Sequence, residues 1–141
     1  MIDNSTFANL VTTEAMETFV PQVPAGIHPA YVKEFKLRQQ KEYWLIDVIW
    51  VVTDQASIDA TQRQEPTVRQ SIFVDFTPDG GLASGTGKNV QLGKLREALN
   101  QNQKGKPWSP GMLVGATANV DVAHEMYKEN LQAKVVAVTR A

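Results

Sequence analysis

The chain has 141 residues, of which 43% are hydrophobic, and it contains no cysteine. This length and composition suit one globular domain with a hydrophobic core, and the lack of cysteine excludes disulfides and thiolate metal sites. The formal net charge of −1 weighs against a protein that binds nucleic acid through overall positive charge.

Charge is unevenly distributed along the chain. Residues 1–32 carry Asp3, Glu14 and Glu17 but no Lys or Arg, whereas residues 88–106 carry five basic residues against the single acid Glu97. A ligand responds to such a local field more than to the net charge. No apolar run reaches membrane-spanning length, and the N-terminus lacks the features of a secretory signal, so we expect a soluble cytoplasmic protein.

The first 22 residues show no sustained hydrophobic period and lead into "VPQVPAG", whose prolines and glycine mark a boundary. We predict an N-terminal arm over residues 1–22, with a short helix around Thr13–Phe19, and one domain over residues 23–141. A mobile terminus and a docking arm both fit this pattern.

Two strands are predicted next. The first runs from Ile27 to Leu37, with Tyr31, Lys33 and Phe35 at period two on one face. The second, "KEYWLIDVIWVVT", is rich in β-branched and aromatic residues. Both of its faces are largely apolar, which indicates a central strand covered on both sides.

The polar segment "DQASIDATQRQEPT" is predicted to be a long mobile loop because it has no apolar periodicity. The following "VRQSIFVDF" alternates as a third strand. Apolar side chains, with Gln70 as the exception, share one face of it, and Arg69, Ser71 and Phe73 share the other.

A helix is predicted from Val90 to Asn102, capped by Asn89. Its apolar stripe consists of Leu92, Leu95 and Leu99. Two further strands follow, "MLVGATANVDVAH" and "LQAKVVAVTRA", with a turn near "EMYKEN". Three strands, a helix and two strands is the element order of the OB-fold, an all-β five-stranded Greek-key barrel.

The glycine-rich stretch "DGGLASGTGKN" is not a Walker A loop. Five residues instead of four separate Gly81 from Gly87, and Lys88 is followed by Asn89 where a magnesium-binding hydroxyl is needed. The glycines are explained by a turn at Asp79-Gly80-Gly81 and a flexible approach to the helix. The same loop and Lys88 can also offer donors to a nucleic-acid phosphate.

Aromatic residues beside cations point to single-stranded nucleic acid, which is held by a basic groove and by rings that stack on bases. The predicted groove is lined by Tyr31, Lys33, Phe35, Arg69 and Phe73, flanked by Lys88, Lys94 and Arg96, with Trp108 as a further ring. Phe73 with Arg69 carries the strongest signal. Tyr31 and Phe35 fit a core position equally well, and Trp108 fits a plug at the bottom of the barrel.

Catalytic signatures are absent from the sequence. His28 and His124 are far apart, and no HExxH, GxSxG or DxD spacing occurs. Asp47 and Asp75 lie on neighbouring predicted strands, where two carboxylates can form a pair that binds Mg²⁺. Solvated or hydrogen-bonded aspartates account for these two residues better than a metal site does. We therefore predict a protein without enzymatic activity, cofactor or metal.

The segments "VPAGIHPAYVKEF" and "QSIFVDFTPDGGLASGTGKNVQLGKLREALNQNQKGKPWSPGMLVG" resemble small tailed-bacteriophage proteins encoded among replication and recombination genes. These are similar to OB-fold single-stranded-DNA-binding proteins. Many such proteins end in an acidic tail that recruits partners, whereas this chain ends "VVAVTRA".

The resemblance implies a viral protein, located in the host cytoplasm, that coats single-stranded DNA in phage DNA replication and recombination. It also implies replication or recombination proteins as partners, and the apolar arm allows homo-oligomers. Two alternatives remain open, a phage structural or assembly β-barrel and a small regulator that binds a host protein.

Overall fold

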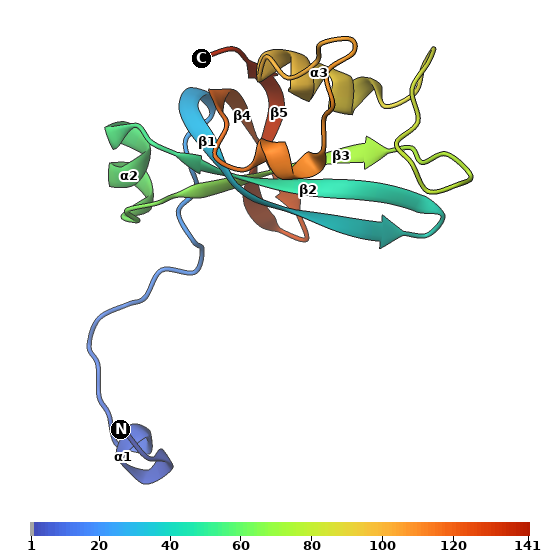
Figure 1. Cartoon of the computed structure of the whole chain (residues 1–141). Helices are drawn as coiled ribbons and strands as arrows, with labels where there is room; N and C mark the ends of the chain where they lie inside the picture. The colour runs from blue at the N-terminus through green and yellow to red at the C-terminus, as the bar shows by residue number, and fades with distance from the viewer. Residues whose placement is uncertain (1) are drawn as a thin grey trace.

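A closed β-barrel of five strands forms the body of the protein (Figure 1). The computed structural model describes residues 2–141. Its elements are α1 (Asn4–Ala8), β1 (Gly26–Gln40), β2 (Tyr43–Val52), α2 (Gln55–Thr61), β3 (Thr67–Val74), α3 (Val90–Ala98), the 3-10 helix η1 (Pro110–Leu113), β4 (Thr117–Tyr127) and β5 (Asn130–Thr139). The predicted all-β, OB-fold-like barrel with one main helix after the third strand is confirmed.

The barrel closes in the order β1-β2-β3-β5-β4. Strand β1 belongs to both halves, because its first part pairs with β4 and its second part with β2. Strands β3 and β5 meet in parallel at one pair only, Arg69 opposite Lys134. The side of the barrel between β3 and β5 is therefore its least paired side.

A β-bulge in β1 changes the expected orientation of its side chains. The register with β2 shifts between Val32 and Glu34, so Lys33 is the extra residue. A bulge resets the alternation of a strand. Tyr31, opposite Val51, consequently lies on the outside, whereas Phe35, opposite Val48, packs against the core. The prediction that Tyr31, Lys33 and Phe35 share one face is wrong.

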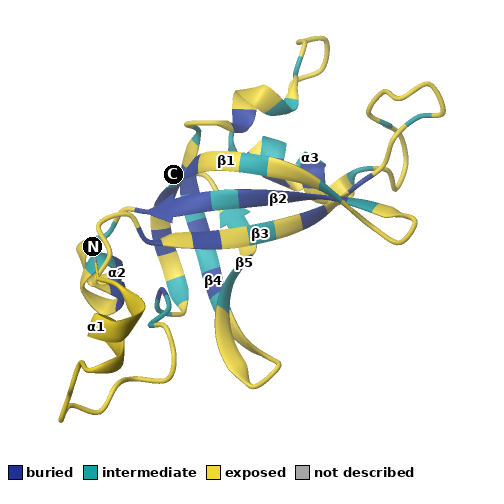
Figure 2. Cartoon of the chain, turned by 90° about the horizontal axis from the view of Figure 1, so that it is seen from below, coloured by how far each residue is buried: buried dark blue, intermediate teal, exposed yellow. Residues whose placement is uncertain are grey.

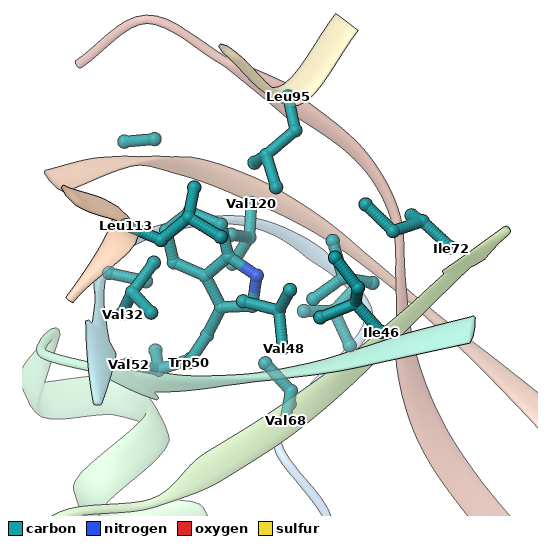
Figure 3. Close-up of a cluster of buried hydrophobic side chains, with 14 of the residues drawn as sticks. Val32, Ile46, Val48, Trp50, Val52, Val68, Ile72, Leu95, Leu113 and Val120 are labelled. Atoms are coloured by element: carbon teal, nitrogen blue, oxygen red, sulfur yellow. The ribbon is translucent and has the colours of Figure 1, made fainter. Parts of the chain in front are cut away.

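The core is centred on Trp50, which is fully buried among side chains from all parts of the barrel (Figure 3). Its indole N–H donates a 3.0 Å hydrogen bond to Oε1 of Gln70. A buried indole needs an acceptor, which explains the one polar residue on the inward face of β3. The inward position of Val68, Ile72 and Val74 is confirmed.

Strand β2 is covered on both faces, as predicted. Figure 2 shows it buried over much of its length. Ile46 and Val48 point into the barrel, and Leu45 and Val51 are buried on the opposite face. The outward apolar residues of β2 form the floor of the surface described below.

Helix α3 closes one end of the barrel by burying Leu92, Leu95 and Ala98. It ends four residues before the predicted Asn102, because Asn100 adopts a left-handed conformation with φ of 57°. The amides of Asn100 and Gln101 then bond to the carbonyls of Glu97 and Arg96, a Schellman arrangement. Asn89 stands at the N-cap position, but its side chain does not cap the helix.

The segment between β2 and β3 is not a structureless loop, because it contains α2. This helix turns two polar side chains, Ser57 and Thr61, toward the protein interior. Thr61 donates to the Ser57 carbonyl at 2.8 Å, and left-handed Gln62 ends the helix. Polar inward positions gave no hydrophobic period, which is why the sequence pattern missed this helix.

The strand predicted to begin near Met112 also starts later. Residues Pro110–Leu113 form η1, and β4 begins at Thr117. The expected turn in "EMYKEN" is confirmed at Lys128 and Glu129, both of which have positive φ.

The N-terminal arm extends away from the barrel (Figure 1). Residues 2–20 are all exposed. The helix within it is α1, capped by the Asp3 carboxylate, which accepts from the Thr6 amide. No helix forms at Thr13–Phe19, so that prediction is wrong. Two backbone carbonyls anchor the root of the arm. The Val23 carbonyl accepts a hydrogen bond from His124 Nε2, and the Pro24 carbonyl accepts one from His28 Nε2, both at 2.7 Å.

Candidate nucleic-acid interface

Three neighbouring strands, β1, β2 and β3, present one continuous outward surface. Cross-strand pairing places Leu45 beside Phe73, Asp47 beside Ser71, and Ile49 beside Arg69. On the other side of β2, the same rows continue into β1 through Arg38, Lys36 and Glu34. We call this surface the outer face.

Two aromatic rings stand exposed at one end of the outer face. Tyr43 and Phe73 are 56% and 52% exposed. Their ring centroids lie 5.9 Å apart in an edge-to-face arrangement. They line a hollow of about 660 Å³, together with Trp44 and Phe76, which form a second edge-to-face pair. Rings left in solvent on a rigid strand offer ready-made stacking surfaces.

The sequence identified Phe73 but missed Tyr43. Strand alternation turned Phe73 outward among polar neighbours, and its exposure confirms that orientation. Tyr43 stands at the start of β2, where its neighbours Trp44 and Leu45 made it look like part of a buried run. Its position beside the turn of the β1–β2 hairpin, where it pairs with Gln40, was the available signal.

Cations line the outer face behind the rings. Arg69 and Lys36 are exposed. Arg69 lies four residues from Phe73 on the same side of β3, about 13 Å along the strand. Acidic Glu34 lies opposite Ile49 in the row that holds Arg69. The face therefore combines a few free cations with rings, rather than forming a strongly basic patch.

Arg38 is held in an ion pair on the same face. Its Nε donates to Asp47 Oδ2 at 2.8 Å, and its second amino nitrogen donates to Oδ1 at 3.1 Å. Ser71 adds a 2.6 Å hydrogen bond to Oδ1. The Arg38 guanidinium lowers the pKa of Asp47 most strongly; burial opposes this, and Ser71 and the charge of Arg69 lower it further. The pair fixes the floor of the face and removes Arg38 as a free cation.

Tyr31 lies at the far end of the same face. Tyr31 pairs with Val51, whereas Phe73 pairs with Leu45. Val51 and Leu45 are six residues apart on β2, so the two rings lie about 20 Å apart along the strand. The Tyr31 hydroxyl contacts Glu65 at 3.4 Å. Lys33 is exposed at the bulge, and Phe35 lies inside. Of the three residues predicted on the first strand, only Tyr31 and Lys33 remain at the surface.

The glycine-rich loop is folded against the end of β3. The Asn89 side chain accepts from the Asp75 amide and donates to the carbonyls of Asp75 and Ala83. Gln91 accepts from the Phe73 amide at 2.8 Å. These bonds satisfy strand amides that have no neighbouring strand. They also place Lys88, which is exposed, at the end of β3 that bears Phe73.

The remaining predicted residues lie elsewhere. Lys94 lines a hollow between β3 and β5 at the edge of the face. The Arg96 guanidinium lies 4.4 Å from the centre of the Trp108 ring, and its Nε donates to the Gln101 carbonyl. Trp108 packs against the core and donates to Gln101 Oε1 at 2.9 Å. Arg96 and Trp108 thus hold the end of α3 and do not join the outer face.

A Ser, His and Asp cluster lies below the other end of the barrel. His28 Nδ1 is 3.2 Å from Asp54 and 3.3 Å from Ser57 Oγ, while Nε2 faces the Pro24 carbonyl. A catalytic triad uses opposite ring nitrogens for the acid and the hydroxyl. Ser57 is also fully buried. Burial acts to raise the pKa of Asp54, but hydrogen bonds from Ser57 and His28 outweigh it and lower that pKa. The cluster is built as a structural anchor.

Metal-ligand geometry is not found within residues 2–141, where no three His, Asp or Glu side chains gather to hold an ion. Asp75 accepts a hydrogen bond from the Asn89 amide, whereas Asp47 is bound by Arg38 and Ser71.

None of the helices within residues 2–141 has the length and apolar character to cross a membrane. Neither the models of known protein families nor the curated proteins include a match to this sequence.

Proposed function

We propose that the outer face binds single-stranded DNA without sequence preference, as expected of a protein that coats DNA during phage replication and recombination. The observation that carries this proposal is the exposed Tyr43–Phe73 pair on a barrel strand, with Arg69 and Lys36 behind it. Rings accept the flat surface of any base, and each stacked base contributes about 1–3 kcal/mol. The nearby cations meet the phosphates.

The number of free cations limits the electrostatic part of the binding. Arg69, Lys36 and Lys33 are exposed, whereas Arg38 is paired with Asp47. Each phosphate contact contributes about −0.7 to the slope of log K against log salt for single strands. We expect a slope between about −1 and −3, with stacking supplying the remaining affinity.

Fluorescence titration with oligo-dT at several salt concentrations tests the proposal. The rings nearest the proposed site, Tyr43 and Trp44, are intrinsic probes. We expect saturable binding at low salt that weakens as salt rises. An unchanged signal at low salt would reject the outer face as a nucleic-acid site.

A second candidate function is supported by the arm. Exposed Phe7, Leu10 and Phe19 favour contacts with protein, as in a phage structural or assembly barrel. Gel filtration with and without DNA separates the two functions, because an assembly subunit forms large closed particles unaided.

A further inference from the structure

Lys106, one of the five basic residues between Lys88 and Lys106, lies at a second surface that the outer face does not use. Beside the end of α3, a hollow of about 280 Å³ is lined by Asn100, Gln101, Gln103, Lys106, Pro107, Trp108 and Met112. We call it the α3–η1 hollow. One wall is the Trp108 ring and another is Met112, which is 48% exposed. Cavities of about 150 Å³ admit benzene, so this hollow has room for one aromatic side chain.

The arm has the complementary character. Its segment from Glu14 to Phe19, "EAMETF", carries two acids and two large apolar side chains, and these two, Met16 and Phe19, are 77% and 67% exposed. A small domain that leaves large apolar side chains in solvent on an acidic segment presents a protein contact surface. The lining of the α3–η1 hollow combines apolar Pro107, Trp108 and Met112 with amide side chains and basic Lys106. Lys104, two residues before Lys106, is exposed. The acids of the arm thus match the basic side chains beside the hollow in charge, and Phe19 matches its apolar part.

Within one copy of the chain the arm leads away from the α3–η1 hollow. The root of the arm is fixed where the Val23 carbonyl bonds to His124. Four residues separate Val23 from Phe19, a reach of at most about 14 Å. The chain leaves η1 for β4 at Thr117, and His124 lies seven residues along that strand, about 23 Å away. Figure 1 shows the arm leaving below the barrel and α3 above it.

We propose that Phe19 of one copy inserts into the α3–η1 hollow of a second copy, with Glu14 and Glu17 facing Lys104 and Lys106. Each copy then has one donor arm and one acceptor hollow. Reciprocal exchange of arms between two copies gives a symmetric dimer, whereas one-way exchange gives rings or open chains. The contact does not involve the outer face, so it is independent of the proposed DNA binding.

Sedimentation velocity of the full chain without DNA tests this contact. The weight-average mass is expected to rise with protein concentration and to fall when salt is added. Phe19→Ser is expected to weaken association roughly tenfold, because an aromatic anchor dominates a small interface. Met126→Ser, at a 66% exposed apolar side chain on β4, is the matched control and should leave association unchanged.

Charge reversal provides the sharper test. The double variants Glu14→Lys/Glu17→Lys and Lys104→Glu/Lys106→Glu should each lose self-association. An equimolar mixture of the two should regain it, since every arm again meets a hollow of opposite charge. A mixture that stays monomeric, or a wild-type chain that stays monomeric at every concentration, overturns the proposal. Oligo-dT titration of the same variants at nanomolar protein tests DNA binding separately. Oligo-dT binding without self-association overturns only the contact between copies, whereas absence of oligo-dT binding overturns the proposed function.

Discussion

Two regions of this barrel place an aromatic ring near an arginine, and they use the combination in opposite ways. At α3, Arg96 lies over the half-buried Trp108 ring and both bond to Gln101. On the outer face, Phe73 and Tyr43 contact each other while Arg69 remains exposed some distance away. In the first region Arg96 already covers the Trp108 ring, whereas in the second the rings and the arginine remain available to a nucleic acid. Availability, rather than composition, separates a structural cluster from a surface that can bind nucleic acid.

Trp108→Ala should have the largest effect, and that effect should be on stability. The ring packs against the core and accepts the Arg96 charge on its face. Truncation of a largely buried Trp costs about 3–5 kcal/mol, and partial exposure should place this variant near about 3 kcal/mol. Urea denaturation followed by circular dichroism measures it. Unchanged stability would show that α3 is not held by this pair.

Phe73→Ala should affect binding and leave the fold intact. Loss of one stacking surface is expected to weaken oligo-dT binding by about 1–3 kcal/mol, or roughly fivefold to 150-fold. Stability should change by less than about 1 kcal/mol, because the side chain is half exposed. Fluorescence anisotropy and urea denaturation give the two values. Equal loss of stability and affinity would remove the distinction between the two regions.

Acid should release the Arg38–Asp47 pair in the floor of the outer face. The Arg38 guanidinium lowers the pKa of Asp47 in the folded protein, so folding stability from this pair is fully present above the ordinary aspartate pKa. It is lost as pH falls below about 4 toward the lowered value. Asp47→Asn should flatten that part of the stability–pH curve. A wild-type curve identical to that of Asp47→Asn would show that the pair does not stabilise the fold.

Arg69→Ala should have the smallest effect. It removes one phosphate contact, so the slope of log K against log salt should become shallower by about 0.7. Lys106→Ala, on the α3–η1 hollow, is the matched control and should leave the slope unchanged at nanomolar protein. A larger change in this slope for Lys106→Ala than for Arg69→Ala would show that the phosphates bind near α3 and not on the outer face.

Much of the barrel could be predicted because its strands follow simple periods. Alternation in β2 and β3 located Trp50 in the core and Phe73 on the outside, and the strand-like and helix-like segments together predicted the five strands with a helix after the third. The bulge at Lys33 could not be predicted, because one inserted residue reverses every later side chain without a sequence marker. Helix α2 was hidden since its inward residues are polar.

The candidate site was only partly accessible for a related reason. Nearness in sequence gathered Lys94, Arg96 and Trp108 into one predicted group, but helix geometry turned Arg96 onto Trp108 and away from Phe73. Tyr43 joined the site through pairing of β2 with β3, a contact between residues thirty positions apart. Side-chain partners of this kind depend on tertiary structure and not on local pattern.

Chemical-shift mapping of the full chain with oligo-dT tests the central claim most directly, since it locates the contact residue by residue. At low salt, the largest changes should fall on Tyr43, Phe73, Arg69 and their strand neighbours. The amides around Arg96 and Trp108 should stay in place. Changes centred on α3, with the outer face unmoved, would contradict the claim that exposed rings on the barrel strands form the binding surface.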